Sequence, residues 1–173
     1  MSVPNVLLLN QGDLRFVNGT TAAGLGHLQK GHGVAFADLD HDGDQDLFNQ
    51  LGGFYPGDAF HNALFVNPGQ DHRFLHVELA GTTSNSHGLG ARLTLRFLED
   101  GVERQLHRAV GSVSSFGGSP FRQELGLGRA SEILELRVHW PASGTTSVVT
   151  EVPLDARVRI TEGVDGLERL ELP

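Results

Sequence analysis

The chain has 173 residues, of which 39% are hydrophobic and 23 are glycine, and its net charge is −8. This length suits one domain or two small ones with a buried core, and the composition is typical of a turn-rich β protein. The negative charge, with no basic stripe to follow phosphates, argues against a nucleic-acid partner. Because cysteine is absent, disulfides and thiolate zinc sites are excluded.

The amino terminus contains no export or membrane signal. Residues 1–5 carry no basic segment, and the apolar run 6–9 is too short for a signal-peptide core or a membrane span. We therefore expect no membrane span, and the chain is either cytosolic or exported by a signal that lies outside it.

A sequence repeat connects two parts of the amino-terminal region. The stretch Asn-Val-Leu-Leu-Leu-Asn-Gln-Gly at 5–12 returns as Asn-Ala-Leu-Phe-Val-Asn-Pro-Gly at 62–69, an offset of 57, and an Arg-Phe pair follows both copies. A period of this size is typical of propeller blades and similar arrays, whose units need neighbours for stability. We expect this region to pack on the rest of the chain, on another subunit or on further blades.

Aspartates alternate with other residues across 38–46, around the central Gly43. Like charges this close repel strongly unless a cation neutralises them, and Ca²⁺ takes about six to eight oxygen ligands in flexible geometry. The pattern predicts a calcium loop with carboxylates from the first three aspartates, the main-chain carbonyl of the fourth and a closing carboxylate from the fifth: Asp38, Asp40, Asp42, Asp44 and Asp46.

This loop differs from an EF-hand. The twelfth position holds Asn49 in place of the bidentate Glu, and the flanks 33–37 and 47–50 contain aromatic and β-branched residues without a helical stripe. The loop is therefore predicted to join two β-strands. An ordinary solvated acidic turn is the alternative.

A long connection follows this predicted hairpin and could carry catalytic groups. Histidines flank the segment 52–58, and we consider a pocket near the calcium ion formed by His32, Tyr55, Asp58 and His61. Such a site would suit a calcium-dependent lyase or hydrolase acting on glycans. No His-Glu-x-x-His, Walker lysine or nucleophile-elbow motif supports it, so an enzyme is the less favoured reading.

From 72 to 163 the sequence alternates with a period of two. Asp100-Gly101 predicts a hairpin, 141–144 predicts a turn, and no stretch shows convincing helical periodicity. We expect a small antiparallel sandwich or jelly roll. On its polar strand faces, His76, His107 and His139 should be solvated, a transition-metal site among them being the alternative. The residues expected to face inward are Leu75, Val77, Leu79, Leu93, Leu95, Phe97, Leu134, Leu136, Val138, Trp140, Val158 and Ile160.

Two resemblances to known families follow from these motifs. Segments 8–16 and 33–46 resemble an FG-GAP or VCBS repeat, a propeller-blade unit with an integrin-like calcium loop. Gly-Thr-Thr-Ser-Asn at 81–85, Gly-Leu-Gly-Ala-Arg at 88–92, Gly-Leu-Gly at 126–128 and Trp-Pro at 140–141 resemble the ASPIC and UnbV domain that follows such repeats in cartilage-acidic-protein-like proteins.

The resemblance implies two domains, at 1–70 and 71–173, and an extracellular or periplasmic, calcium-supported protein with adhesion or matrix roles. It implies no settled activity for the terminal domain. The chain departs from the family where Ser86 replaces Arg, where 111–118 replaces a Gly-Ser-x-Tyr-x-Ser-Gln run, and where Glu124 replaces His. Any binding site that relatives build at these positions is altered here.

Together these observations predict an all-β chain in which one propeller-blade-like β unit with a calcium loop packs on or beside a small antiparallel β-sandwich or jelly roll. We expect a calcium-binding interaction module for a protein or glycan. The alternatives are the glycan-acting enzyme and a structural terminal cap of a longer propeller. Homo-oligomerisation or attachment to further blades would suit either non-enzymatic function.

Overall fold

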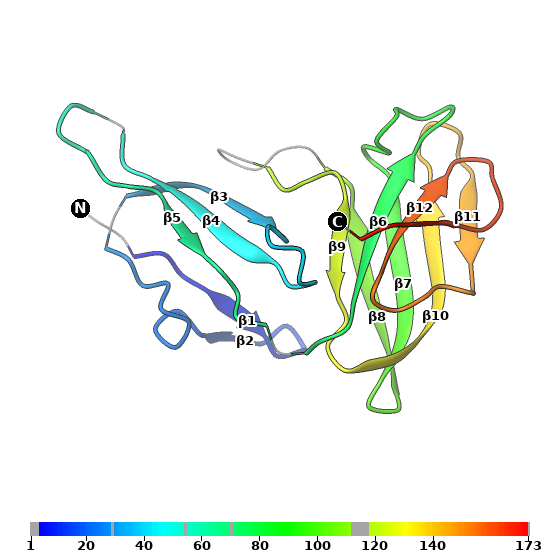
Figure 1. Cartoon of the computed structure of the whole chain (residues 1–173), viewed down its shortest axis with the longest axis horizontal. Helices are drawn as coiled ribbons and strands as arrows, with labels where there is room; N and C mark the ends of the chain where they lie inside the picture. The colour runs from blue at the N-terminus through cyan, green and yellow to red at the C-terminus, as the bar shows by residue number, and fades with distance from the viewer. Residues whose placement is uncertain (1–3, 29, 54, 70, 112–117, 173) are drawn as a thin grey trace.

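The computed structural model describes residues 4–28, 30–53, 55–69, 71–111 and 118–172. Thirteen β-strands and no helix occur in these residues (Figure 1). The strands are β1 (Leu8–Asn10), β2 (Phe16–Asn18), β3 (Gly31–Ala37), β4 (Asp46–Leu51), β5 (Ala63–Phe65), β6 (Phe74–Ala80), β7 (Arg92–Glu99), β8 (Val102–Ala109), β9 (Gln123–Gly126), β10 (Ala130–His139), β11 (Thr146–Val149), β12 (Ala156–Thr161) and β13 (Glu168–Leu170).

The first five strands form two small antiparallel sheets. β1 pairs with β2, while β3, β4 and β5 form a sheet in that order, with the acidic loop joining β3 to β4 as predicted. The two copies of the repeat end in the same turn. The side-chain oxygen of Asn10 accepts a hydrogen bond from the Gly12 amide, and that of Asn67 accepts one from the Gly69 amide. The repeat therefore encodes a strand followed by an Asn-x-Gly turn.

The remaining strands form a sandwich of two four-stranded sheets, with orders β11-β10-β7-β8 and β13-β12-β6-β9. This confirms the predicted all-β, sandwich-like fold. Pairing is antiparallel except between β12 and β6, which run parallel with Ala156 opposite Leu75. The sheet that contains β9 faces the amino-terminal region in Figure 1.

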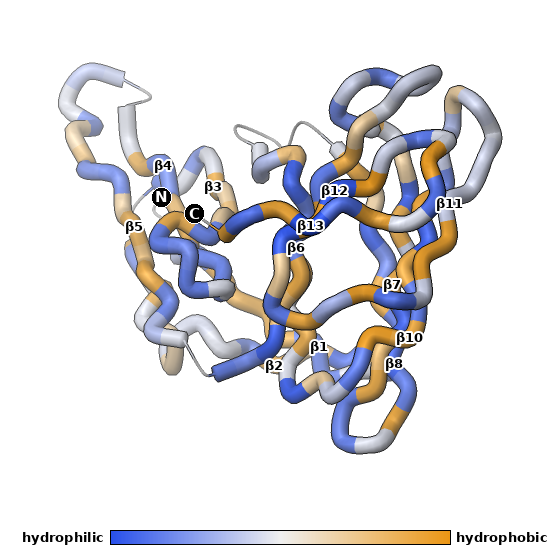
Figure 2. Tube along the Cα trace, turned by 45° about the vertical axis from the view of Figure 1, so that its right-hand side comes forward, coloured by the Kyte–Doolittle hydropathy of each residue, from blue (hydrophilic) through white to orange (hydrophobic). Residues whose placement is uncertain are grey.

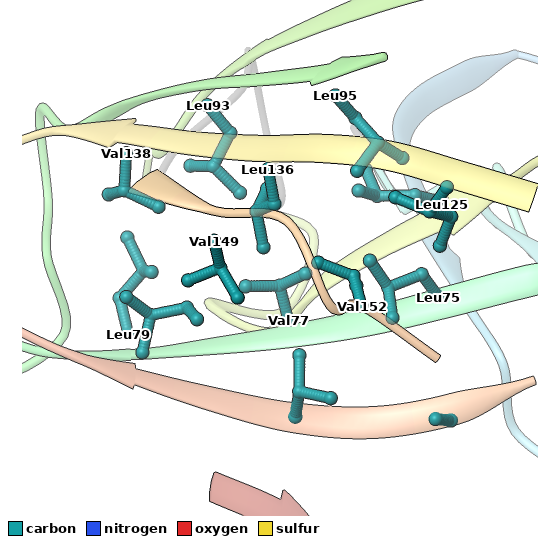
Figure 3. Close-up of a cluster of buried hydrophobic side chains, with 14 of the residues drawn as sticks. Leu75, Val77, Leu79, Leu93, Leu95, Leu125, Leu136, Val138, Val149 and Val152 are labelled. Carbon is teal, nitrogen blue, oxygen red and sulfur yellow. The ribbon is translucent and has the colours of Figure 1, made fainter. Parts of the chain in front are cut away.

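The apolar side chains that alternate along the strands fill the space between the two sandwich sheets. Figure 3 shows Leu75, Val77 and Leu79 of β6 on one side of this space and Leu93 of β7 and Val138 of β10 on the other. Trp140 is fully buried in the same core and donates its indole N–H to the Ser147 hydroxyl at 3.0 Å. Each such apolar side chain stabilises the fold by about 1.5–3 kcal/mol relative to exposure.

One inward-facing residue was predicted wrongly. Leu134 is only partly buried, while Ile133 is buried together with Leu136. The pairing of β10 with β7 shifts register between Ile133 and Glu135, which marks a β-bulge. An extra residue at a bulge breaks strict alternation, and the sequence pattern alone places such a residue on the wrong face.

The predicted hairpin at Asp100-Gly101 is confirmed. β7 pairs with β8 in register from Arg92 opposite Ala109 to Glu99 opposite Val102. Asp100 and Gly101 both have positive φ, 51° and 76°, which is the backbone that a two-residue primed turn requires. The turn residues therefore fix this register.

Apolar residues occur in both halves of the chain (Figure 2), but only the sandwich gathers them into a large core. In the amino-terminal region, residues 4–69, the buried hydrophobic residues are Leu25 and Leu51 among those described. Leu14 is 94% exposed, and Phe16 and Leu64 are also exposed. The described strands form open sheets, with no closed propeller. The described part of the chain also contains no helix that is long and apolar enough to span a membrane.

Candidate metal centre

The acidic loop brings three of the predicted ligands together. Carboxylate oxygens of Asp38, Asp40 and Asp42 lie within 4.8 Å of one another, and these three form the cluster among the described residues. Asp38 is 2% exposed, whereas the other two face solvent. The loop therefore has one deep carboxylate and two shallow ones.

Hydrogen bonds within the loop orient these carboxylates. The Gly43 amide donates to Asp38 Oδ2 at 3.2 Å, and the Asp44 amide donates to Asp42 Oδ1 at 2.9 Å. Gly43 has φ +97°, a conformation that glycine adopts without steric cost. The chain folds back on itself at this glycine, so the first and third aspartates point into the same space.

Asp46 closes the loop from β4. Its Oδ2 accepts the Leu39 amide at 3.0 Å and its Oδ1 accepts the Asn67 amide at 2.9 Å. Asn67 belongs to the second copy of the repeat, so this carboxylate ties the acidic loop to the turn after β5. Each oxygen retains a second lone pair, and ligation is compatible with these bonds.

The buried carboxylate of Asp38 is incompletely satisfied. Its Oδ1 has no hydrogen-bond partner among the described residues. Burial raises the pKa of Asp38 above its ordinary value, the Gly43 hydrogen bond lowers it, and the charge of Glu124 raises it again. A buried anionic oxygen without a partner is costly, and a cation would supply what is missing. The oxygen-only donor set suits a hard divalent ion such as Ca²⁺.

The loop packs against the outer face of the sandwich. Glu124 of β9 accepts hydrogen bonds at Oε2 from the Asp38 amide at 2.9 Å and from the Gln45 side chain at 3.0 Å. Its other oxygen accepts from the Arg122 guanidinium at 2.6 and 3.1 Å. A Cβ on Gly43 would collide with the ring of Phe74 on β6. The acidic loop thus contacts two neighbouring strands.

His76 lies beneath the loop and is buried. It stands opposite Glu124 in the β6–β9 ladder, and its Nε2 is 3.5 Å from Asp38 Oδ2. Burial, reinforced by the charge of Arg122, lowers the pKa of His76 to about 4, so its ring is neutral at neutral pH. Neither ring nitrogen has a hydrogen-bond partner among the described residues.

The predicted solvation of His76 was wrong because the loop covers this face of the sheet. His107 and His139 are exposed as predicted. They lie on β8 and β10 of the other sheet, hydrogen-bonded to threonine hydroxyls, so a metal site shared with His76 is not formed by this arrangement. Pairing of each with a neighbouring threonine is ordinary surface structure.

The other candidate residues lie away from the acidic loop. His32 is on β3, while Tyr55, Asp58 and His61 lie in the connection after β4, at the opposite end of that six-residue strand (Figure 1). The length of β4, roughly 20 Å, separates the two ends. Lys30 donates a hydrogen bond to the Tyr55 hydroxyl and lies 4.0 Å from the centre of its ring. These residues do not surround the predicted ion.

Sequence reasoning missed His76 and Glu124 as contacts of the loop, and it missed Gln45 as the loop side chain that bonds Glu124. The only advance signal was that Glu124 replaces a histidine of the resembled family. The chain departs from the resembled family at two other places. At the first, the carbonyl of Ser86 accepts a hydrogen bond from the Gly81 amide at 3.3 Å. At the second, the segment 111–118, residues 112–117 lie outside the described ranges.

Comparison with known families identifies the second half of the chain. A family model described as ASPIC and UnbV matches residues 81–166, which include β7 to β12. None of the curated proteins compared with the chain matches it. The resemblance of the first half to FG-GAP or VCBS repeats stays a prediction. Within the sandwich, residues 81–166 are therefore similar to the ASPIC and UnbV domain.

Proposed function

We propose that this chain is a calcium-supported interaction module in which Ca²⁺ is bound in the Asp38–Asp46 loop and a protein or glycan is bound by the surface that the ion stabilises. The observation that carries the proposal is the buried Oδ1 of Asp38, which has no hydrogen-bond partner among the described residues and lies close to the carboxylates of Asp40 and Asp42. The ion would neutralise their mutual repulsion. Asp44 would contribute its carbonyl, and Asp46 its carboxylate.

The proposed role of the ion is structural. The loop fastens the β3–β4 hairpin to the turn after β5 through Asp46 and to the sandwich through Glu124. The open oxygen-ligand site favours a dissociation constant of roughly 10⁻⁴–10⁻³ M, as in extracellular modules. A site of this affinity would be filled only where calcium is abundant, as in the extracellular or periplasmic location that the family resemblance implies.

The proposed contact surface is the β3–β4–β5 sheet. Phe48 and Leu64 stand opposite one another on neighbouring strands, and both are exposed. An exposed apolar cross-strand pair of this kind favours contact with a protein partner or with the apolar face of a sugar ring. We favour this module over the enzyme alternative, whose candidate residues lie at the far end of β4 from the acidic loop.

Calorimetric calcium titration of the full chain tests the proposal. We expect wild-type protein to bind one ion and Asp40→Asn to bind at least about tenfold more weakly, because one shallow carboxylate loses its charge. The matched control is Asp165→Asn, which alters an exposed aspartate outside the loop. With calcium at about 100 times the dissociation constant, the metal adds about 2.7 kcal/mol, or roughly 5–10 °C in melting temperature. Equal melting with and without chelator would refute the proposal.

A structural module that packs on further β units is the second candidate, and the repeat favours it. The second copy of the repeat includes β5, which pairs with β4. The first copy includes β1, which pairs with β2 alone among the described strands and whose three residues are all exposed. By analogy with β5, a further β4-like strand could pair with β1. Such a strand would come from another copy of the chain or from an adjoining β unit.

A further inference from the structure

We infer, on the basis of the calcium site proposed above, that Glu124 of the ASPIC and UnbV domain is a positioning residue for that site, so that calcium affinity and docking of the amino-terminal hairpin on the sandwich are one coupled property. Glu124 does not belong to the acidic cluster. It acts through the main chain of Asp38 and the side chain of Gln45.

Four hydrogen bonds hold the carboxylate of Glu124 in place. It is buried on the outer face of β9, which would face solvent if the loop were absent. Its Oε1 is held by two bonds from Arg122, which leaves Oε2 aimed at the loop. Charge-assisted hydrogen bonds of this kind are stronger than neutral ones. The carboxylate is therefore a preformed receptor for the first residue of the acidic loop.

The sandwich accounts for the difference between deep and shallow ligands. Asp38, which contacts Glu124 and His76, is buried, whereas Asp40 and Asp42 are exposed. Moving the hairpin off the sandwich would return Asp38 to water and remove the enclosure of its Oδ1. Residues that orient a ligand without touching the metal commonly change metal affinity by about 10–100-fold.

Electrostatics point the same way. Glu124 adds a carboxylate beside the deep aspartate, and Arg122 balances only part of that negative charge. An arrangement that places like charges together costs free energy until a cation arrives. Binding of calcium should therefore favour the docked hairpin, and docking should favour calcium by the same factor, because coupling between two binding events is reciprocal.

Calcium titration of the intact chain tests this inference with a matched control. We expect Glu124→Gln to raise the calcium dissociation constant by about tenfold and Glu124→Ala by more, since the amide retains one acceptor oxygen. Glu162→Gln is the control, because Glu162 is a buried carboxylate of the same domain that bonds other loops. It should lower the melting temperature while leaving the calcium dissociation constant within about twofold of wild type. A milder variant is Gln45→Ala, which removes the hydrogen bond that the exposed side chain of Gln45 donates to Glu124. It should weaken calcium binding without impairing folding.

The single tryptophan gives an independent readout of the coupling. Trp140 lies in the sandwich core, so its fluorescence follows unfolding of the sandwich and not of the hairpin. Chelation should lower the melting temperature seen at Trp140 in wild-type protein, and this shift should shrink in Glu124→Ala and Gln45→Ala. Wild-type affinity in both variants would overturn the inference while leaving the proposed calcium site standing. A wild-type chain that binds no calcium would overturn both.

Discussion

At the scale of single residues, Gly43 shows why the acidic loop needs glycine for two separate reasons. Its φ of +97° is a left-handed conformation, and the position of a Cβ is already taken by the ring of Phe74. The first reason is local and follows from the sharp turn of the acidic loop. The second is a contact with a strand that begins far along the sequence. Glycine is therefore required at this position both by the shape of the loop and by the close contact of the loop with the sandwich.

We expect Gly43→Ala to destabilise the chain by roughly 2–4 kcal/mol, from left-handed strain together with overpacking against Phe74. Gly101→Ala is the matched control, because Gly101 also has positive φ but no atom lies within 4 Å of its would-be Cβ. This control should lose only the strain, roughly 1–2 kcal/mol. Urea unfolding of both variants measures the difference. Equal losses would show that the Phe74 contact carries no energy.

Residue identities predicted the carboxylate cluster better than they predicted its surroundings. Asp38, Asp40 and Asp42 could be chosen from spacing alone, because alternate residues of a tight loop converge on its centre. His76 was assigned to solvent on the same kind of reasoning and is 2% exposed. Alternation distinguishes the two faces of a strand, but it cannot tell which outer face another segment covers.

At the scale of elements, a buried carboxylate joins the loops at one end of the sandwich. Glu162, just after β12, accepts the amides of Thr82, Thr83 and Ser84 at 2.7–2.8 Å and the hydroxyls of Ser84 and Ser143. These residues belong to the β6–β7 connection and to the turn after β10. The Gly-Thr-Thr-Ser-Asn motif of the ASPIC and UnbV resemblance is therefore a carboxylate-binding loop with a structural purpose.

This arrangement makes the sandwich sensitive to acid. Burial opposes ionisation of Glu162, but the hydrogen bonds from Ser143, Ser84 and Thr82 outweigh it and lower its pKa from 4.5 to about 2. A depressed pKa means that the contribution of Glu162 to stability is complete above pH 4.5 and is lost as the pH falls towards 2. The melting temperature, followed at Trp140, should fall across this range.

Glu162→Gln isolates this contribution. The variant should melt several degrees below wild type at neutral pH, and the difference should narrow as the pH approaches 2, since the wild-type carboxyl is then also neutral. The comparison requires only melting curves at a series of pH values. A constant difference between the two proteins from pH 4.5 to 2 would contradict the assignment.

At the scale of the whole molecule, the two halves differ in how they satisfy their apolar residues. The sandwich encloses a continuous core, whereas β1 and β2 leave Leu8, Leu9, Phe16 and Val17 exposed. An exposed apolar strand pair with open edges is a site for further β-strand contacts. Repeat units that cannot bury their own faces normally obtain this burial from neighbours.

We expect the isolated chain to self-associate through β1 and β2 as its concentration rises. Val17→Ser should weaken the association, since a hydroxyl replaces part of the apolar contact. Val102→Ser is a close control, because both valines are 53% exposed and Val102 lies in the sandwich, on β8. Sedimentation velocity over a concentration series measures the effect. A chain that remains monomeric, or equal effects of the two substitutions, would argue against the structural-module candidate.

The sequence by itself determined the strands, the Asp100-Gly101 hairpin and the acidic loop, because each depends on a period of two or on turn residues that are near neighbours in the chain. Only the tertiary structure decided what the loop rests on. Asp38 and Glu124 are 86 positions apart, and their hydrogen bond exists because the sandwich brings β9 beneath the hairpin. Local patterns specify which carboxylates come together, whereas the burial of Asp38, and with it the cost of leaving its oxygen without a partner, comes from contacts between distant segments.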